Sequence, residues 1–391
     1  MFYVGIDVSK DKHDCHIFDS NGVIHLDNFS FKNNKVGFSS FLKILKSLDN
    51  SFFEKIKVGL ESTGHYSVNL ISFLEDNEIS LTVLNPLTVS QSRRASSLRR
   101  TKTDKNDARY IAHLLVSDEF KTHLKTLNLI SSLKSLTRAR FRLNKEIQPL
   151  KNRYCRLIHI VFPEISEFFC TVYSSSVYAV LKELSSASHI AKCNITKLTN
   201  ILKANSHGKH ARAKAEELKL LAINSIGSSN IGDCIELKLS IDRIVFLGEQ
   251  KKCYDKEINN IMNEINSPIT SIPGIGTVLG ATILAELGDV SKFTNSGQIL
   301  AFAGAEPNTY ESGKFVSTNN SMVKHGSRYL RHALFLATTM AYIHSSNMKC
   351  YIDKKRSQGK HYYVSISHGM KKLTRIIFAV LSKNILFTEK I

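Results

Sequence analysis

Short apolar runs separated by turn residues open the chain and predict a sheet with interleaved helices. Alternating apolar and polar positions indicate strands, and the Asn21-Gly22 pair is typical of a hairpin turn between two of them. Phe38, Phe41 and Leu45 recur at helical spacing and indicate the first helix. In chain order, the expected elements are strands at 2–8, 13–19 and 23–31, a helix at 35–48, a strand at 56–61, a helix at 66–76, a strand at 79–84 and a further helix.

The order of these elements, three strands followed by alternating helices and strands, is that of the ribonuclease H-like fold. We therefore expect an α/β domain over residues 1–120. A competing interpretation treats Gly5-Ile-Asp-Val-Ser9 as the first strand of an actin-like or sugar-kinase-like ATPase. Such ATPases need Gly-rich phosphate loops at later positions, and the sequence offers no adequate one.

From about residue 129 the apolar spacing changes to a seven-residue repeat. Leu136, Leu143, Leu150 and Leu157 follow this repeat, which is the pattern of a helix that packs along a partner helix. Pro149 falls within the stretch and is expected to kink the helix or to break it in two.

A second heptad-like stretch runs through Leu237, Ile241 and Ile265. The two stretches predict an antiparallel helical hairpin or coiled coil over residues 121–265, which is also a natural dimerisation element. Residues 163–232 between them are rich in Ser, Asn and Lys and have weak periodicity, so irregular helices are expected there.

The charge balance points to the kind of partner. The 391 residues include 53 Lys and Arg against 34 Asp and Glu, a formal net charge of +19. Such an excess predicts a polyanionic partner, most often nucleic acid, because phosphate binding releases counterions. A ribosome-adjacent or membrane-surface protein is the alternative. The seven cysteines form no C-x-x-C pair, so a reduced, cytoplasmic protein without a zinc site or a disulfide framework is expected. No signal peptide and no membrane span are expected.

Four acidic residues lie at the ends of expected elements. Asp7 ends the first strand, and Glu61 ends the fourth. Asp104 and Asp107 open a helix and lie on one of its faces. Mg²⁺ prefers oxygen ligands such as carboxylates, and two such ions about 3.5–4 Å apart activate the attacking oxygen and stabilise the leaving oxygen in phosphoryl displacement. Taken singly, Asp7 is more simply a turn residue and Glu61 a cap residue. Together the four acids predict a catalytic site for Mg²⁺, with room for two ions.

Two basic stretches are expected to hold nucleic acid by its phosphate backbone. One stretch precedes the acidic pair, and a solvated loop is its alternative. The other lies on the first heptad helix, which carries almost no acid to balance its charge. The predicted contacts are Arg93, Arg94, Arg99, Arg100 and Lys102 in the first stretch and Arg138, Arg142 and Lys145 in the second.

Residues 266–391 are expected to form a third, mainly helical domain. Ser271-Ile-Pro-Gly-Ile-Gly276 before an apolar helix is similar to a helix-hairpin-helix. In that motif Gly274 and Gly276 let backbone N–H groups approach a DNA phosphate. An ordinary Pro-Gly turn before a buried helix explains the same pattern, and both interpretations stay open.

A polar loop with a Ser-Gly pair follows the next apolar helix. Ser312 in this loop is a candidate nucleophile. A serine that attacks phosphate keeps the bond energy as a phosphoserine, so strands are rejoined without a high-energy cofactor. Composition alone favours a turn serine. Downstream basic residues are predicted to contact nucleic acid, namely Lys324, Arg328 and Arg331.

Six motifs in this order resemble the DEDD transposases of bacterial insertion sequences. That family comprises bridge-RNA-guided recombinases, to which Piv-type DNA invertases are related. The resemblance covers roughly residues 1–120 and 265–345. The motifs are Gly5-Ile-Asp-Val-Ser-Lys10, Glu61-Ser-Thr-Gly-His-Tyr66, Thr103-Asp-Lys-Asn-Asp-Ala-Arg109, Ser271-Ile-Pro-Gly-Ile-Gly276, Ala303-Gly-Ala-Glu-Pro307 and Ser312-Gly313.

The resemblance implies a RuvC-like domain that binds Mg²⁺ through Asp7, Glu61, Asp104 and Asp107. It also implies a C-terminal transposase domain in which Ser312 becomes covalently joined to DNA. In such enzymes, domains of different protomers form a composite site in a dimer or tetramer. A structured RNA pairs with donor and target double-stranded DNA, so that base pairing recognises the sequence and the protein holds RNA and duplex by shape and charge.

Three hypotheses follow. The first is a DNA recombinase that moves its own element through a serine-linked intermediate, with a Piv-like site-specific invertase as its close variant. The second is a RuvC-like structure-specific nuclease in which water attacks and Ser312 is incidental. The third is a nucleic-acid-binding scaffold whose acids are surface residues, as in a decayed element.

Overall fold

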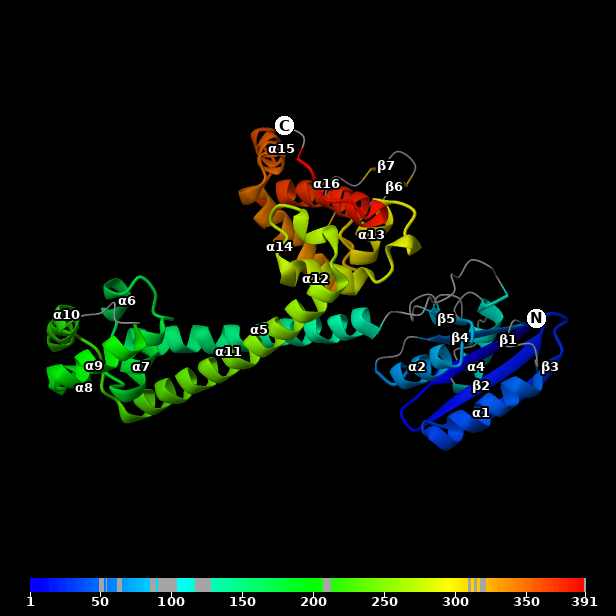
Figure 1. Ribbon diagram of the computed structural model, residues 1–391, viewed down its shortest axis with the longest axis horizontal. Coiled ribbons are helices and arrows are strands. Elements are labelled where there is room, and N and C mark those ends of the chain that lie inside the picture. Colours follow the sequence, from blue (N-terminus) through cyan, green and yellow to red (C-terminus); the bar gives the residue numbers. More distant parts are fainter. Residues whose placement is uncertain are drawn as a thin grey trace. The chain divides into compact units, whose positions relative to one another are not determined.

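The computed structural model describes residues 1–48, 53, 55–61, 65–84, 89–90, 104–116, 128–206, 212–308, 311–312, 315–316 and 321–389. The chain forms two compact units, Met1–Thr126 and Leu127–Ile391. Figure 1 draws the first unit in blue to cyan and the second in green to red. None of the described helices is both long enough and apolar enough to span a bilayer.

The first unit is a mixed five-stranded sheet with helices, as the apolar pattern predicts. Its strands lie in the order β3-β2-β1-β4-β5, where β1 pairs antiparallel with β2 and parallel with β4. The predicted elements are confirmed with shifts of one or two residues at their ends. They are β1 (Phe2–Val8), β2 (Lys12–Asp19), β3 (Ile24–Lys32), α1 (Lys35–Leu48), β4 (Ile56–Glu61), α2 (Val68–Asp76), β5 (Leu81–Leu84) and α4 (Asp104–Leu114).

The two faces of this sheet are covered in different ways. On one face Val4, Ile6 and the neighbouring apolar side chains form a core with residues of α1 and α2, such as Phe41 and Leu74. On the other face α4 packs against β1, β2 and β4. A Cβ atom at Gly5 would lie 2.1 Å from the carbonyl oxygen of Ala108 in α4. The absence of a side chain at Gly5 therefore lets α4 lie directly on the sheet.

Two long antiparallel helices form the backbone of the second unit. These are α5 (Asn128–Val161) and α11 (Ile231–Ile265). Arg140 near the middle of α5 pairs with Asp255 of α11, whereas Arg156 near the end of α5 pairs with Glu236 near the start of α11. The predicted antiparallel pairing of two heptad helices is thus confirmed.

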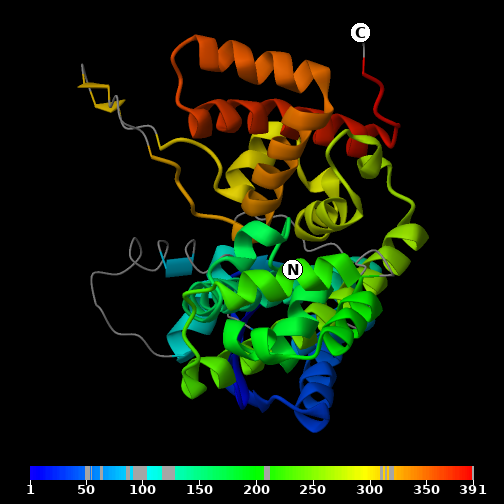
Figure 2. The same cartoon turned by 90° about the vertical axis from the view of Figure 1, so that its left-hand side faces the viewer.

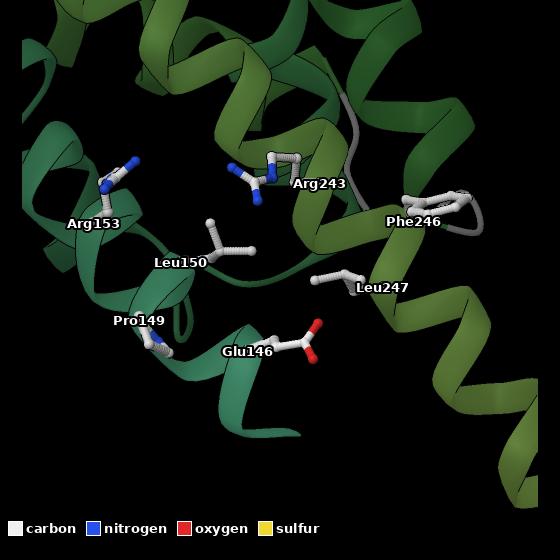
Figure 3. Close-up of a pocket in the computed structure, with 7 residues that line it drawn as sticks. All are labelled: Glu146, Pro149, Leu150, Arg153, Arg243, Phe246 and Leu247. Atoms are coloured by element: carbon white, nitrogen blue, oxygen red, sulfur yellow. The ribbon is translucent and has the colours of Figure 1, made fainter. Parts of the chain in front are cut away.

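Pro149 lies inside α5, which continues through it as one helix of 34 residues. The prediction of a break at Pro149 is wrong. Leu143, Leu150 and Leu157 stay buried on both sides of the proline, and this packing offsets the single backbone hydrogen bond that the proline removes. Beside Pro149, α5 and α11 leave a half-open groove of about 590 Å³, into which Leu150 and Leu247 point (Figure 3).

Between the two long helices, the described residues 162–206 and 212–230 contain five short helices. They surround a core that also contains the C-terminal half of α5 and the first half of α11. Ser174, Ser186 and Asn194 cap three of these helices with their side-chain oxygens. The expectation of irregular helices over residues 163–232 is thus confirmed for the described residues. These helices are short, which explains the weak apolar periodicity of the sequence here. The helices are α6 (Ile165–Phe168), α7 (Ser175–Glu183), α8 (Ala187–Lys192), α9 (Ile195–Asn205) and α10 (Arg212–Ile223).

The remaining residues form a second, mainly helical core with the other ends of α5 and α11. In this part α15 and α16 lie side by side (Figure 2). The three-part division of the chain at residues 120 and 265 stays a prediction. The elements here are η1 (Pro268–Ser271), α12 (Thr277–Leu287), η2 (Val290–Lys292), α13 (Ser296–Ala303), β6 (Glu311–Ser312), β7 (Phe315–Val316), α14 (Arg328–His344), α15 (Ser346–Ser357) and α16 (Tyr362–Lys383).

We expect Gly5→Ala to destabilise the first unit. The new methyl group would meet the backbone of α4, which cannot yield as a flexible side chain can. Overpacking of this kind costs about 1–3 kcal/mol. Denaturant unfolding followed by circular dichroism measures the effect.

Gly248→Ala in α11 is the matched control, because a Cβ atom there meets nothing within 4 Å. It is expected to leave stability unchanged or to raise it by up to about 1 kcal/mol. Equal unfolding midpoints for Gly5→Ala and the unmodified protein would contradict the close approach of α4.

Candidate functional site

Asp7 and Glu61 lie at the same end of neighbouring strands. β1 and β4 run parallel, with Ile6 opposite Leu60, so the next residue on each strand brings the two acids side by side. Gly5 lies on the face that α4 covers, and Asp7 shares that face because side chains alternate along a strand. Glu61 shares it as well, since a Cβ atom at Gly59 would meet the side chain of Leu115, just after α4.

The direction of α4 brings its first turn to these two acids. His113, near the end of the helix, lies over Phe18, 4.7 Å between ring centroids, and Phe18 pairs with the start of β1. Ala108 lies over Gly5, further along the strand. The helix therefore runs opposite to β1, and its N-terminal turn lies at the Asp7 end.

That first turn carries the predicted acidic pair. Asp107 is only 6% exposed, so its carboxylate lies within the packed structure. Asp104 is the first residue of α4, but its side chain lies outside the described residues. The structure thus brings Asp7, Glu61 and the start of α4 to one corner of one face of the sheet.

Asp14 is a further acid at this corner, and the sequence analysis did not identify it. Asp14 on β2 pairs directly with Asp7 and is 1% exposed. It shares the face of Phe18, because both are even positions of the same strand. The hydroxyl of Ser30 donates a hydrogen bond to Asp14, and the ammonium of Lys12 lies 3.2 Å from its other oxygen. The signal that points to this neighbour of Asp7 is the short connection at residues 9–11, which joins β1 to β2 and sets their antiparallel register.

The donor chemistry at this corner fits Mg²⁺. Asp7, Glu61, Asp107 and Asp14 offer hard carboxylate oxygens, which are the ligands that Mg²⁺ prefers. Among the described side chains, no three His, Cys, Asp or Glu residues already stand close enough to hold an ion together. The metal role of the four predicted acids stays a prediction.

A second polar network clamps α4 onto the sheet. Nδ1 of the buried His16 lies 2.9 Å from Asp27, and Arg109 of α4 donates to both carboxylate oxygens of Asp27 at 3.1 and 3.2 Å. Burial opposes ionisation of Asp27, but the hydrogen bonds from Arg109 and His16 outweigh it and lower its pKa. Burial lowers the pKa of His16, so its ring is neutral near pH 7. This network was not predictable from residue spacing, since its members come from the three separate elements β2, β3 and α4.

The basic residues predicted to bind nucleic acid have different surroundings. Arg93, Arg94, Arg99, Arg100 and Lys102 lie outside the described residues. Arg142 and Lys145 are exposed on α5, and Lys145 lies 5.7 Å from the centre of the Phe141 ring. Both side chains are open to a phosphate backbone.

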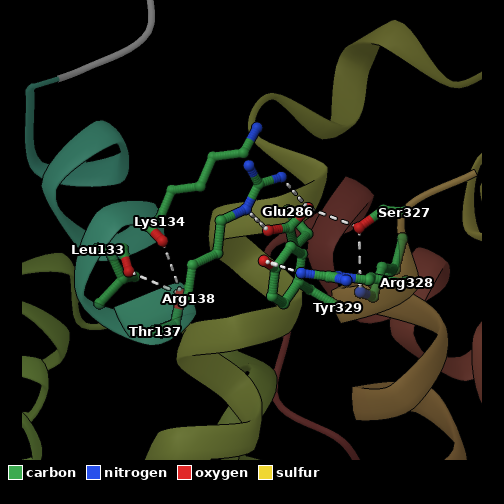
Figure 4. Close-up of polar contacts among 9 residues, drawn as sticks. Leu133, Lys134, Thr137, Arg138, Glu286, Ser327, Arg328 and Tyr329 are labelled. Carbon is green, nitrogen blue, oxygen red and sulfur yellow. Dashed lines mark hydrogen bonds and ion pairs between the residues drawn. The ribbon is translucent and has the colours of Figure 1, made fainter. Parts of the chain in front are cut away.

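Arg138 makes an internal ion pair that the sequence did not reveal. Its guanidinium donates to both oxygens of Glu286 in α12, at 2.6 and 2.9 Å (Figure 4). Ser327, which caps α14, donates to the same carboxylate at 2.7 Å. Glu286 is 2% exposed. Burial opposes ionisation of Glu286, but the hydrogen bonds from Arg138 and Ser327 outweigh it and lower its pKa. We call these three residues the Glu286 joint, because they tie α5, α12 and α14 together.

The two glycines of the helix-hairpin-helix-like motif also differ. Gly274 has φ +86°, and a Cβ atom there would lie 2.4 Å from the backbone nitrogen of Ala341 in α14. Its lack of a side chain is explained by this packing and by the turn before the buried helix α12. Gly276 is exposed at the start of α12, where an added Cβ meets nothing within 4 Å. A phosphate contact at the two glycines stays a prediction.

Ser312 lies in a short antiparallel pair of strands. It stands opposite Phe315 in the β6–β7 pair, and its side chain lies outside the described residues. Lys324 and Arg328 are exposed on the chain that follows. Arg331 has an internal partner, because it donates to the carbonyl oxygen of Ala303 at 2.8 Å at the end of α13.

Comparison with known proteins places these features in a family context. A family model described as a transposase matches residues 4–163, and a model described as the transposase IS116/IS110/IS902 family matches residues 266–353. The first match contains the acidic corner, and the second contains Ser312.

Individual relatives match over nearly their whole length. An uncharacterized 44.8 kDa protein of insertion element IS116 from Streptomyces clavuligerus is 23% identical, over 99% of this chain and 96% of its own. The mini-circle putative transposase for IS117 of Streptomyces coelicolor is 23% identical, over 95% of this chain and 91% of its own. The pilin gene-inverting protein of Moraxella bovis is 22% identical, over 100% of this chain and 98% of its own.

The Glu286 joint predicts a pH-dependent stability. Because the pKa of Glu286 in the folded protein lies below its ordinary value of 4.5, its contribution is present above pH 4.5 and is lost as the pH falls further. Arg138→Met takes the guanidinium away from the buried carboxylate, to which the Ser327 hydroxyl still donates, and is expected to cost roughly 3 kcal/mol at pH 7. Denaturant unfolding at pH 7 and at lower pH measures the free energy of unfolding of both proteins. The difference between the variant and the unmodified protein should become smaller as the pH falls.

Arg156→Met is the control, because the pair between Arg156 and Glu236 is exposed on both sides. Such surface pairs contribute about 0–1 kcal/mol. Equal destabilisation by the two substitutions would show that burial of Glu286 adds nothing.

Proposed function

Because the chain belongs to the IS110/IS116 family of DEDD transposases, which is related to the pilin gene-inverting proteins, we propose that it is the recombinase of an insertion sequence and acts through a phosphoserine at Ser312. Membership of a transposase family implies DNA binding and the cleavage and joining of DNA strands. The proposal adds the residues, the covalent intermediate, the metal and the partners.

The observation that carries the proposal is the acidic corner of the first unit. Asp7 and Glu61 stand side by side at the ends of parallel strands, on the face where α4 presents Asp107. We propose that these three acids and Asp104 hold one or two Mg²⁺ ions. When bound, such ions activate an attacking oxygen and stabilise a leaving oxygen at phosphorus. The buried positions of Asp107 and Asp14 hold the carboxylates in place before DNA binds.

In the proposed reaction the hydroxyl oxygen of Ser312 attacks a DNA phosphorus and loses its proton. The bond from phosphorus to one deoxyribose oxygen breaks, and that oxygen leaves as a hydroxyl. The phosphoserine ester keeps the energy of the broken bond, so the hydroxyl of another strand can displace Ser312 and form a new phosphodiester. No other energy source is needed for joining.

We propose that the active protein is a dimer or tetramer in which Ser312 of one protomer acts with the acids of another. Support comes from α11, which exposes Ile231, Ile235 and Leu239 at successive turns of one face. An exposed apolar stripe on a long helix suits a second helix of the same kind. The α5–α11 hairpin is thus our proposed coiled-coil dimerisation element.

The partners we propose are donor and target double-stranded DNA and a structured guide RNA. The formal charge of +19 supports a polyanionic partner. Arg142 and Lys145 on α5, together with Lys324 and Arg328, offer exposed cations for phosphate contacts that carry no sequence information. An RNA that base-pairs with DNA would then supply the sequence recognition.

A second candidate function is site-specific DNA inversion. It is favoured by the full-length match to the pilin gene-inverting protein of Moraxella bovis. Inversion and insertion share the same bond exchange, so the two functions differ in the arrangement of the DNA sites.

Ser312→Ala should abolish the covalent protein–DNA adduct and strand exchange. Loss of a nucleophile lowers the rate by roughly a thousandfold or more. Asp7→Asn should abolish the Mg²⁺-dependent reaction as well. A labelled oligonucleotide with the element's end, incubated with Mg²⁺ and resolved under denaturing conditions, measures both adduct and cleavage.

Ser321→Ala is the matched control, because Ser321 is an exposed serine on the same segment. It should keep the adduct. Undiminished cleavage by Ser312→Ala would instead support the nuclease hypothesis, in which water attacks. Undiminished activity of Asp7→Asn would remove the metal site from the proposal.

The RNA partner is tested by isolating the protein from its cells and sequencing the RNA that accompanies it. We expect an abundant transcript from the DNA that flanks the gene, enriched over total RNA and over an unrelated tagged protein. Absence of such a transcript would favour an RNA-independent, invertase-like enzyme.

A further inference from the structure

A groove of about 310 Å³ lies at the base of the segment that carries Ser312. One wall comes from the two limbs of that segment, and the other comes from α16. We call it the Tyr363 groove. Its lining residues are Ala305, Pro307, Met322, Tyr363, Val364, Ser367, His368 and Lys371.

The wall formed by the segment of Ser312 is stabilised by backbone hydrogen bonds between its two limbs. Pro307 and Met322 form an antiparallel bridge, the Asn308 N–H donates to the Ser321 carbonyl oxygen at 2.8 Å, and the Val323 N–H donates to the Glu306 carbonyl oxygen at 2.9 Å. The backbone polar groups on this wall are therefore paired with each other. Pro307 and Met322 can present apolar surface to the groove without leaving those groups unsatisfied.

The opposite wall exposes an aromatic ring. Tyr363 is 61% exposed and Val364 is 46% exposed at the start of α16. The Tyr363 ring stacks against Phe335 with centroids 6.2 Å apart. The rings of His361 and Tyr362 also contact the Tyr363 ring, so the ring is held by its neighbours while most of the side chain stays exposed. A supported, open ring of this kind is a platform on which a planar group can stack.

The surroundings of this ring are cationic. Burial first and then the charges of Lys360, Lys355 and Lys371 lower the pKa of His368, so three ammonium groups act on one point of the groove. The described lining holds no carboxylate. Asp353, on the neighbouring helix α15, accepts a hydrogen bond from Tyr342 at 2.6 Å. The groove thus combines apolar and aromatic walls with positive charge from Lys371 in its lining and from Lys355 and Lys360 nearby.

A nucleotide is the ligand that combines a planar, stackable ring with a nearby anion. In duplex DNA the base faces are covered by stacking, so the ring of Tyr363 suits a base that has left the helix. We propose that the Tyr363 groove binds an unpaired nucleotide of the DNA strand, with its base on Tyr363 and an adjoining phosphate at Lys371. This inference rests on the proposed function for its choice of DNA as the partner.

The position of the Tyr363 groove also supports a role in the DNA reaction. The limbs that form the groove wall belong to the same segment as Ser312, which stands in β6. A strand exchange must free the ends of the cut strand from their duplex before they are rejoined. Holding a freed nucleotide beside the nucleophile's segment would keep that end close and aligned.

The test is direct binding of a fluorescent single-stranded DNA oligonucleotide, measured by anisotropy over a range of salt concentrations. Tyr363→Ala should weaken binding by about 10-fold, within the range found when a base loses an aromatic partner. Its salt dependence should stay unchanged, because no charge is removed. Lys371→Ala should reduce the slope of log affinity against log salt by about 0.7, the value for one phosphate contact of a single strand.

Tyr363→Phe keeps the ring and should bind as the unmodified protein does. Tyr173→Ala, which removes a tyrosine beside the other core of this unit, should also leave binding unchanged. The affinity of the protein for duplex DNA of the same sequence should fall by less than about threefold in Tyr363→Ala. Because Tyr363 is largely exposed, its truncation leaves the fold intact, and circular dichroism checks this.

Single-strand binding by Tyr363→Ala within twofold of the unmodified protein would overturn the proposal. An equal loss for duplex and single strand would overturn it too, and so would a greater loss for RNA of the same sequence, which would assign the groove to the guide. Since this assay involves no bond breaking, it gives its answer even if Ser312→Ala leaves the reaction unchanged. The failure of one claim is thus distinguishable from the failure of the other.

Discussion

The close contact between α4 and the sheet is the constraint on which the acidic corner, formed by Asp7, Glu61 and Asp107, depends. Gly5 lets the backbone of Ala108 lie directly on β1, and Arg109 ties the helix to Asp27 and so to His16. A helix held this near to β1 and β4 brings Asp107 to the strand ends that carry Asp7 and Glu61. A longer separation would leave each acid an isolated surface charge.

In the second unit, a buried ion pair holds distant elements together. Buried Glu286 accepts from Arg138 of α5 and from Ser327 at the start of α14. An unpaired carboxylate at this depth would be costly, so the three elements are held in one arrangement. Since α14 follows the segment of Ser312 in the chain, the joint fixes one anchor of that segment to the long helix. Both units therefore position their proposed chemistry through buried polar contacts between elements distant in sequence.

Much of this architecture was predictable because it is local. Apolar alternation located β1 to β5, heptads located α5 and α11, and strand ends identified Asp7 and Glu61. Contacts between distant elements were not predictable, since no spacing along the chain reveals them. Arg138 appeared to be a nucleic-acid contact because its partner Glu286 lies in another helix. Asp14 was missed because only the strand register places it opposite Asp7. Pro149 was expected to kink or break its helix, but packing on α11 keeps α5 as one continuous helix.

The most direct test of the acidic corner is a crystal structure of the protein soaked with Mn²⁺, which replaces Mg²⁺ and scatters anomalously. We expect an anomalous peak within coordination distance of carboxylate oxygens from both Asp7 and Asp107, and no peak at that place in crystals of the Asp7→Asn variant. A peak bound elsewhere, or a corner that stays without metal at saturating Mn²⁺, would contradict it.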